Sequence, residues 1–392
     1  MNVEKLRNDF PVLQKDVVYF DNACMSLKPV QVISAMQSYY ENYTACGGRS
    51  MHQFSKKVDE EVAKARQTIK KFINAKSDNE IVFTKNTTEA INLIAHSLDW
   101  KQGDVVLTSD KEHNSNLVPW QQLKKQGIMH QAIQSNKDNT FNIENLKKVL
   151  TKKVKLIAIQ QTSNLDGANF PIEEIAKLAH DNGTLILVDA AQSVPHMAVD
   201  VKKLDVDFLA FSGHKMLGPT GTGVLYGKYH LLENLNPFVT GGETVVETTY
   251  ESAEFEKPPH KFEAGLQNYA GIIGLNAAIK YLMPIREEIH EHEVQLNKII
   301  SEGLKDKVTI IGPEDPKQRG GIVSFYTKMD SHEIALMLDQ QNILIRSGAH
   351  CVHSWFNAHN LQGSARASVY FYNTKEEAKV FVEKTQKILA LK

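Results

Sequence analysis

Phe208-Leu-Ala-Phe-Ser-Gly-His-Lys-Met-Leu-Gly-Pro-Thr-Gly-Thr-Gly-Val-Leu-Tyr226 is the stretch that decides the fold of this chain. It opens with an apolar run that predicts a buried strand, and it breaks at Ser212-Gly213. His214 and Lys215 follow, ahead of three glycines that leave backbone room around them. Ligands of open α/β sheets bind where the strands end, so Lys215 is expected in a ligand site. Partial desolvation there suits its amine to a Schiff base.

A second apolar run, Thr184-Leu-Ile-Leu-Val-Asp189, ends in an acid. Asp189 and Lys215 are then expected at the same end of two strands. A carboxylate can pair with a pyridinium nitrogen and a lysine can hold an aldehyde, which are the two groups that pyridoxal phosphate requires. A lone lysine after a strand is more often solvated. The glycines do not form a nucleotide loop, because no Gly-Lys-Ser/Thr follows them.

The segments 212–223 and 188–192 together resemble the class V aminotransferases, which are fold-type I pyridoxal-phosphate enzymes. Within that family they are most similar to the SufS- and CsdA-like cysteine desulfurases. The resemblance covers nearly the whole chain and implies an α/β fold. A large domain with a mostly parallel, seven-stranded sheet is expected over residues 16–270, and a small α+β domain over residues 1–15 and 271–392. The alternation of apolar strands and amphipathic helices also favours a largely parallel sheet. Beyond it, the apolar pattern predicts helices over Phe262–Met283 and Arg286–Leu304 and a strand over Ala367–Tyr372.

Composition excludes several classes of protein. The 45 basic and 46 acidic residues nearly cancel, so no single-sign field attracts nucleic acid or a membrane surface. No stretch approaches the roughly 20 apolar residues of a membrane span, and residues 1–10 lack the apolar core of a secretory signal. The cysteines, at positions 24, 46 and 351, fit neither a disulfide framework nor a metal site. A cytoplasmic protein without a metal is expected.

Thr84-Lys-Asn-Thr-Thr-Glu-Ala90 joins a predicted strand to a helix predicted over Thr87–Ser97. Backbone amides at a helix N-terminus bind anions, although a capping threonine explains the same residues. The resemblance implies that the cofactor phosphate is held by four residues of this segment and of the central stretch, namely Thr87, Thr88, Ser212 and His214.

Three further cofactor contacts are implied by the resemblance. The segment 112–120 is similar to one that places His113 over the pyridine ring, where an imidazole can also move a proton. The segment 162–167 is similar to a Ser-Asn-x-x-Gly turn, so Asn164 is expected near the phenolic oxygen and the substrate. Gln192 is expected to donate to the same oxygen. A solvated histidine and a simple Asn-Gly turn are the ordinary explanations of these residues.

Leu344-Ile-Arg-Ser-Gly-Ala-His-Cys351 follows an apolar strand. Gly348 permits a mobile loop, and Arg346 and His350 are expected as cations that favour the nucleophilic thiolate. Most free cysteines are small buried hydrophobes. However, Arg-Ser/Thr-Gly-x-His-Cys is closely similar to the nucleophile loop of SufS-like desulfurases, which implies that Cys351 attacks the substrate sulfur.

Gly363-Ser-Ala-Arg-Ala-Ser368 is similar to the family segment that binds the substrate carboxylate, so Arg366 is expected to clamp that group through two hydrogen bonds. The implied reaction converts L-cysteine to L-alanine. Lys215 removes the α-proton, Asp189 keeps the ring protonated, and Cys351 retains a persulfide. The resemblance also implies a homodimer and a sulfur-acceptor protein in iron–sulfur cluster assembly. Selenocysteine lyase activity stays open.

Three places depart from the family pattern. Leu266 stands where relatives often have a threonine that reaches the phosphate in the partner subunit. Gly48 stands where relatives often have a histidine, in a loop that also contains Cys46 as a second thiol. The segment 352–355 replaces one in which a proline usually follows soon after the cysteine. These changes leave the pose of the loop and its sulfur acceptor open.

Other functions remain compatible with the sequence. One is another class V enzyme, such as an aminotransferase, racemase or epimerase, in which Cys351 is not catalytic. Another is a sulfur-transfer partner or scaffold with weak turnover of its own. Consumption of a keto acid would identify the aminotransferase, and strong stimulation by an acceptor protein would identify the transfer partner. A nucleotide-binding α/β module is disfavoured, because the chain has no phosphate loop.

Overall fold

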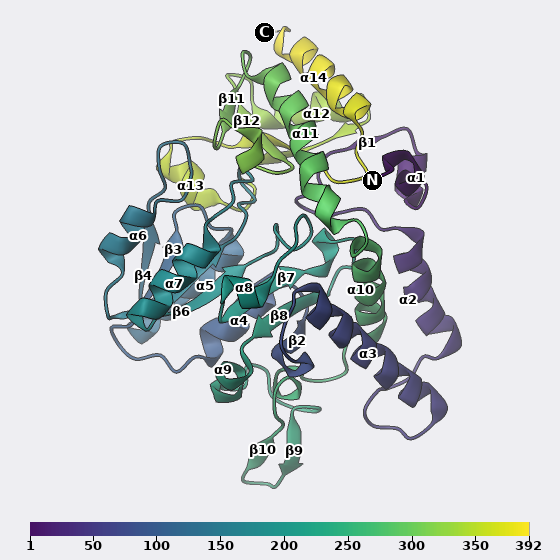
Figure 1. Ribbon diagram of the computed structural model, residues 1–392, viewed down its shortest axis with the longest axis vertical. Helices are drawn as coiled ribbons and strands as arrows, with labels where there is room; N and C mark the ends of the chain where they lie inside the picture. Colours follow the sequence, from purple (N-terminus) through teal and green to yellow (C-terminus); the bar gives the residue numbers. More distant parts are fainter. Residues whose placement is uncertain (392) are drawn as a thin grey trace.

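The computed structural model describes residues 1–391. Its largest sheet has the strand order β2-β8-β7-β6-β5-β3-β4 and forms the body of the molecule (Figure 1). The strands are β2 (Ile81–Thr84), β3 (Val105–Ser109), β4 (Met129–Ile133), β5 (Val154–Gln160), β6 (Leu185–Asp189), β7 (Phe208–Ser212) and β8 (Gly223–Gly227). β8 runs antiparallel to β2 and β7, and the other pairs are parallel. The expected seven-stranded, mostly parallel sheet is therefore confirmed.

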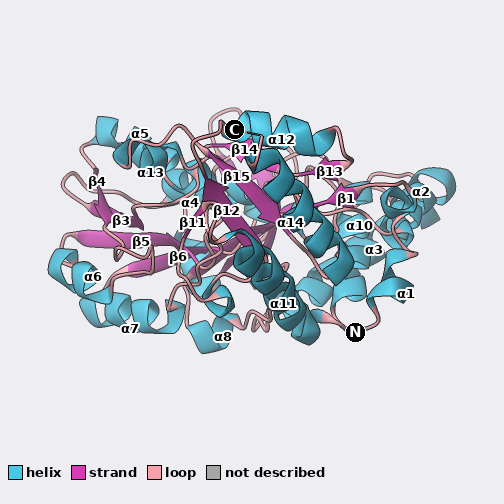
Figure 2. Ribbon diagram, turned by 90° about the horizontal axis from the view of Figure 1, so that it is seen from above, coloured by secondary structure: helices cyan, strands magenta, loops and turns pink. Residues whose placement is uncertain are grey.

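Two apolar clusters cover the two faces of this sheet. On β5, Ile157 packs in one cluster with α7 (Ile172–Asn182), and Leu156 packs in the other with α4 (Thr87–Ser97). Adjacent residues of a strand point to opposite faces, so a nearly continuous apolar run is what a sheet covered on both sides requires. Figure 2 shows helices on both sides of the strands. The other helices of this region are α5 (Val118–Gln122), α6 (Ile143–Val149), α8 (Val201–Leu204) and α9 (Tyr229–Asn234).

A second, antiparallel sheet of order β11-β12-β15-β14 lies in the C-terminal third, at the top of Figure 1. Its strands are β11 (Thr309–Ile311), β12 (Ile322–Tyr326), β14 (Arg346–Gly348) and β15 (Ser364–Ser368). They pack with three helices around a third apolar cluster. These helices are α11 (Arg286–Leu304), α12 (Ser331–Asp339) and α14 (Lys375–Leu389).

The N-terminal segment packs on this C-terminal third. Arg7 of α1 (Val3–Arg7) forms an ion pair of 2.9 Å with Glu377 of α14. β1 (Val18–Tyr19) pairs in parallel with β13 (Ile343–Leu344). The expected division into residues 16–270 and residues 1–15 with 271–392 stays a prediction.

Three long helices pack side by side at one end of the large sheet. α10 (Tyr269–Leu282) contacts both α2 (Val30–Asn42) and α3 (Gln53–Phe72). α10 is buried along most of its length, because apolar residues surround its axis on nearly every side. Within the described residues, no helix combines the length and apolarity that crossing a bilayer requires.

Several local predictions were wrong. The strand expected over 367–372 ends at Ser368, because the aromatic residues beyond it turn into a buried cluster and Tyr370 N donates to Asn373 Oδ1. The helix expected from Phe262 begins only at Tyr269, where Asn268 provides the N-cap. The predicted capping threonine of α4 is also wrong: Asn86 caps that helix by accepting from Glu89 N at 2.9 Å.

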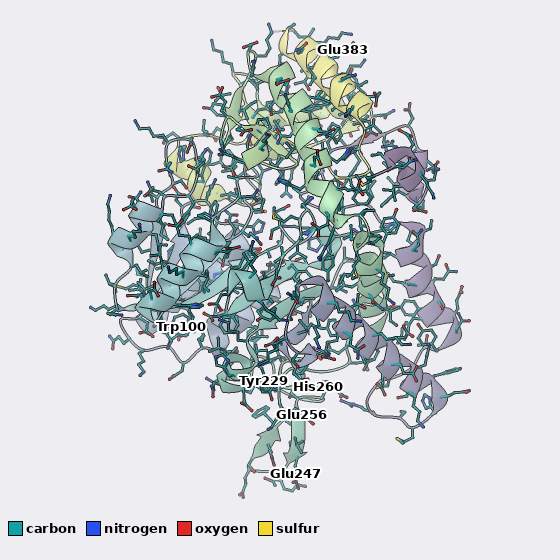
Figure 3. The ribbon with its side chains drawn as sticks, in the orientation of Figure 1. Trp100, Tyr229, Glu247, Glu256, His260 and Glu383 are labelled. Atoms are coloured by element: carbon teal, nitrogen blue, oxygen red, sulfur yellow. The ribbon has the colours of Figure 1, made fainter. Side chains whose placement is uncertain are left out.

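The elements that were missed include a helix and a hairpin. α13 (His353–Ala358) follows Cys351 directly. A hairpin of β9 (Val245–Thr248) and β10 (Ala253–Phe255) projects from the lower end of the molecule in Figure 1. Glu247 lies within it, and Glu256 lies at its base (Figure 3). Its strands are short and mostly exposed, so no buried apolar face marks them in the sequence.

Candidate active site

Asp189 and Lys215 meet at the carboxyl ends of β6 and β7. Asp189 is the last residue of β6, and Lys215 ends a 3-10 turn that follows β7. Gly213 permits this turn, because a Cβ there would lie 2.2 Å from Thr222 Oγ1. Burial lowers the pKa of Lys215 and raises that of Asp189, and the opposite charge of each partly offsets the shift of the other. Both residues line a cavity of about 190 Å³.

Four residues predicted to bind a phosphate lie along the same cavity. Thr87 N donates to Ser212 Oγ at 2.9 Å, and the two hydroxyls are 2.7 Å apart. Thr88 Oγ1 lies 2.7 Å from Ser115 Oγ. Burial, with the nearby charge of Lys215, lowers the pKa of His214 to about 4, so its imidazole is neutral near pH 7. The first turn of α4 and these hydroxyls form a concave set of donors for an anion.

His113 also lines the cavity as a neutral ring. Its Nδ1 accepts a hydrogen bond from Ser115 N at 3.0 Å, which leaves the proton on Nε2. Burial lowers the pKa of His113 to about 3, and the positive charges of Lys215, Arg346 and Arg366 contribute. A neutral imidazole can stack on an aromatic ligand without repelling the surrounding cations.

Arg366 enters the cavity from β15 and is almost fully buried. Its Nη1 donates to Asn164 O at 2.8 Å, and its Nη2 lies 3.4 Å from Asp21 Oδ1. Nε has no partner among the described residues. One edge of the guanidinium thus keeps unused capacity for hydrogen bonding, as a carboxylate ligand would need.

The loop around Cys351 closes one side of the site. Arg346 Nη2 lies 3.6 Å from Cys351 Sγ, and Arg346 and His350 line the cavity whereas Cys351 does not. His350, a potential cation by sequence, is neutral near pH 7, because burial and the two neighbouring arginines hold its pKa well below its usual value. Gly348, His350 and Cys351 all have positive φ, at 103°, 49° and 60°.

Three comparisons identify the family. The model of the class V aminotransferases matches residues 18–381. The chain is 42% identical to a probable cysteine desulfurase of Synechocystis, over 97% of this chain and 94% of that protein. It superposes on the apo cysteine desulfurase of Thermococcus onnurineus NA1 with a TM-score of 0.96, at 38% identity, covering 99% of this chain and 98% of that one. It superposes on the Escherichia coli cysteine desulfurase CsdA with a TM-score of 0.93, at 32% identity, covering 100% of this chain and 99% of that one.

The chain belongs to the class V aminotransferase family. The expected family resemblance and fold are thereby confirmed. The cofactor expected in this cavity is pyridoxal phosphate. Four buried polar atoms of residues that line the cavity have no partner among the described residues, namely Asn164 Oδ1, Gln192 Oε1, His350 Nδ1 and Arg366 Nε. Buried polar atoms are normally satisfied, so they indicate a polar ligand. With a lysine, an acid and an anion cradle beside them, the site fits this cofactor.

Sequence reasoning missed two residues of this class V site. Cys24 lines the cavity. Asp21 forms the ion pair with Arg366. The only signal was their position after a predicted strand, in Asp21-Asn-Ala-Cys24. Cys46, considered as a second thiol, does not line this cavity.

Proposed function

We propose that this class V protein is a pyridoxal-phosphate-dependent cysteine desulfurase, which converts L-cysteine to L-alanine and leaves the sulfur as a persulfide on Cys351. The observation that carries the proposal is the joining of Lys215, Asp189 and Arg366 in one cavity, with Arg346 bridging to the Cys351 thiol. Full-length relatives that carry the name cysteine desulfurase support it.

The family resemblance assigns the cofactor-binding roles, and the gathering of the donors around one cavity supports them. Lys215 would hold the aldehyde carbon, and Asp189 would pair with the ring nitrogen. Thr87, Thr88, Ser212 and His214 would hold the phosphate. His113 would stack on the ring, and Gln192 and Asn164 would lie near its phenolic oxygen. When bound, pyridoxal phosphate supplies an electron sink for the electrons of the substrate Cα–H bond.

The chain's own residues then perform the proton and sulfur transfers. Arg366 binds the α-carboxylate and fixes the orientation of Cα. Lys215, whose lowered pKa keeps the amine available as a base, accepts the Cα proton. Cys351 Sγ forms a bond to the substrate sulfur while the carbon–sulfur bond breaks, and the carbon skeleton keeps that electron pair and gains a proton. The balance is cysteine plus one thiol giving alanine plus one persulfide.

We further propose that two copies associate and that an acceptor protein takes the persulfide sulfur, in the cytoplasm, for iron–sulfur cluster assembly. An apolar hollow supports the association: Phe238, Val239 and Leu266 line a cavity of about 210 Å³, and Leu266 is 67% exposed. The half-buried Cys351 supports transfer to an external acceptor.

The test of the activity is the release of alanine and sulfide from L-cysteine with a thiol reductant, in the wild type and in Cys351→Ala. We expect the wild type to release both and the variant to release neither. Full activity in Cys351→Ala would contradict the role of Cys351, and consumption of a keto acid without release of alanine and sulfide would replace the proposal with an aminotransferase.

A further inference from the structure

A fully buried ion pair lies behind the candidate active site. Lys111 Nζ is 2.6 Å from Asp166 Oδ2, and neither side chain is exposed. Lys111 precedes His113 by two positions, and Asp166 follows Asn164 by two. The pair therefore joins two segments that each supply a residue to the cavity. A buried pair of this kind needs further hydrogen bonds to offset the loss of hydration.

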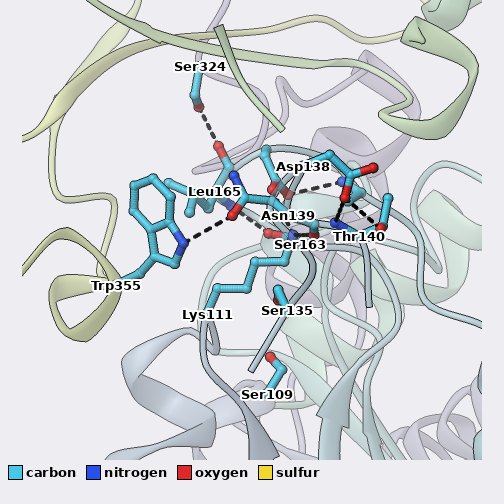
Figure 4. A network of polar contacts seen from close by, with 12 residues as sticks. Ser109, Lys111, Ser135, Asp138, Asn139, Thr140, Ser163, Leu165, Ser324 and Trp355 are labelled. Atoms are coloured by element: carbon cyan, nitrogen blue, oxygen red, sulfur yellow. Dashed lines mark hydrogen bonds and ion pairs between the residues drawn. The ribbon is translucent and has the colours of Figure 1, made fainter. Parts of the chain in front are cut away.

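Those hydrogen bonds connect the ion pair to the loop around Cys351, which we call the cysteine loop. Lys111 Nζ also donates to Asn139 O at 2.5 Å. The side chain of the same Asn139 accepts from Trp355 Nε1 at 3.3 Å. Trp355 lies in α13, four positions after Cys351. Figure 4 shows Asn139 between the Lys111 ammonium and the Trp355 indole.

The Asn164 turn contacts the same loop from the other side. Asn164 Nδ2 donates to His350 O at 2.8 Å, and Asn114 N donates to Cys351 O at 2.7 Å. Leu165 shares a buried apolar cluster with Trp355. The segments that flank the ion pair thus hold the cysteine loop at the residues before, at and after the thiol.

The loop needs such support because its backbone is strained. His350 and Cys351 are consecutive residues with a left-handed backbone, and neither is glycine. Each such residue costs about 1 kcal/mol or more and persists only where the surroundings determine its conformation. Without the flanking contacts the loop would relax, and the thiol would move relative to the cavity.

We propose that Lys111 and Asp166 are positioning residues, which hold Cys351 in its reactive pose through Asn139 and Trp355 on one side and the Asn164 turn on the other. The proposal rests on the proposed role of Cys351 as the sulfur nucleophile. The pair touches neither substrate nor cofactor. The pair fixes the position of the Cys351 thiol for sulfur transfer, and the rate of that step falls when the nucleophile is displaced even slightly.

The experiment measures two properties of the cofactor-loaded enzyme. One is the rate at which iodoacetamide alkylates Cys351, followed by peptide mass with Cys46 as the internal reference. The other is kcat and KM for alanine release. For Lys111→Met we expect alkylation to rise about threefold or more as the loop opens. We expect kcat to fall about tenfold to a hundredfold, with KM within about twofold, because the carboxylate clamp is untouched.

Two further variants separate positioning from folding. Lys111→Met leaves the Asp166 carboxylate buried and unpaired, so the double variant Lys111→Met/Asp166→Leu removes both charges and should recover thermal stability. It still lacks the donor to Asn139 O, so both effects should persist. Trp355→Phe removes the indole donor and part of the ring volume, and it should shift both quantities in the same direction by a smaller factor. Lys147→Met, which removes an exposed lysine of α6, is the matched control and should change neither.

Wild-type kcat and wild-type Cys351 alkylation in a stable double variant would overturn the proposal. Failure of the proposed role of Cys351 is detected separately, by full alanine release in Cys351→Ala, and failure of the desulfurase assignment by the absence of alanine release in the wild type. The alkylation rate needs no turnover, so it reports the position of the loop whatever the reaction.

Discussion

The charges in the cavity determine how its histidines act. Lys215, Arg346 and Arg366 gather there, and buried imidazoles beside them lose their protons. His113 and His350 are therefore neutral near pH 7. They can stack, donate and accept, while the net positive charge of the site is left to bind an anionic cofactor and a substrate carboxylate.

Arg366→Lys should raise KM for L-cysteine about tenfold to a hundredfold, because an ammonium cannot make the paired hydrogen bonds of a guanidinium to a carboxylate. Steady-state alanine release measures this, with cofactor absorbance as the check that the site is loaded. Arg286→Lys, outside the cavity, is the control. An unchanged KM would show that another group binds the carboxylate.

Lys28 should make stability rise with pH. Burial lowers its pKa from 10.5 to about 8 in the folded protein. Below pH 8 both states are protonated and the folded state carries the full cost of the buried ammonium. Between pH 8 and 10.5 the unfolded chain binds more protons, so the free energy of unfolding increases with pH.

Urea unfolding at pH 7.5 and 9.5 measures this effect. The wild type should gain about 2 kcal/mol relative to Lys28→Met over that interval. Parallel pH profiles for the two proteins would contradict the assignment to Lys28.

The sequence predicted which residues line the site better than it predicted their protonation states. Lys215 and Asp189 do line one cavity, because the ends of the adjacent strands β6 and β7 meet at one sheet edge, and Arg366 lines it from β15 of the second sheet. The neutral state of His350 could not be predicted, since it depends on burial and on Arg366, which lies 16 positions away in the chain and on another strand.

At the scale of the elements, short turns bring the parts of the site into contact. Gly167 ends the Asn164 turn with φ of 76°, and a Cβ there would lie 1.9 Å from Arg319 O. The turn after β5 therefore packs directly on the backbone of the C-terminal third. Gly183 caps α7 with φ of 77° and open space around it.

Gly167→Ala and Gly183→Ala form a matched pair with the same backbone penalty. Gly183→Ala should lower the free energy of unfolding by about 1 kcal/mol, from the left-handed conformation alone. Gly167→Ala should lower it by about 2 kcal/mol more, because the methyl group overlaps a backbone carbonyl. Urea midpoints measure both, and equal losses would mean that the contact with Arg319 relaxes freely.

Long elements were predicted from the sequence, whereas elements without a distinct apolar pattern were missed. α11 was expected over Arg286–Leu304 and lies there, since its charged and apolar residues alternate with helical spacing. α13 was not expected, because Trp355 and Phe356 are too few to show a period. The strand expected at 367–372 failed for the related reason that buried aromatic residues suit a strand and a packed turn equally.

At the scale of the whole molecule, the N-terminal segment packs on the C-terminal third. α1 and β1 pack on α14 and β13, and Ser368 N donates to Phe20 O at 2.7 Å. The largely parallel character of the large sheet followed from the alternation of strands and helices. This return of the first residues to the last could be expected only from the family resemblance, because no local pattern encodes such a distant pairing.

Leu266→Asp should weaken the proposed association of two copies. Burial of one leucine contributes about 1.5–3 kcal/mol, so the dissociation constant of the dimer should rise about tenfold or more. Sedimentation equilibrium measures it. Leu391→Asp is the matched control, since Leu391 is 71% exposed but lies at the other end of the molecule. A monomeric wild type would contradict the proposed dimer.

The pairing of β1 with β13 has a consequence for how the protein is made. Val18 leaves the ribosome long before Ile343, its partner in the strand pair. During synthesis the backbone groups of β1 therefore stay without this partner until most of the chain has emerged. A chain that stops before Ile343 therefore lacks this partner strand and exposes Phe20, which is fully buried in the finished molecule.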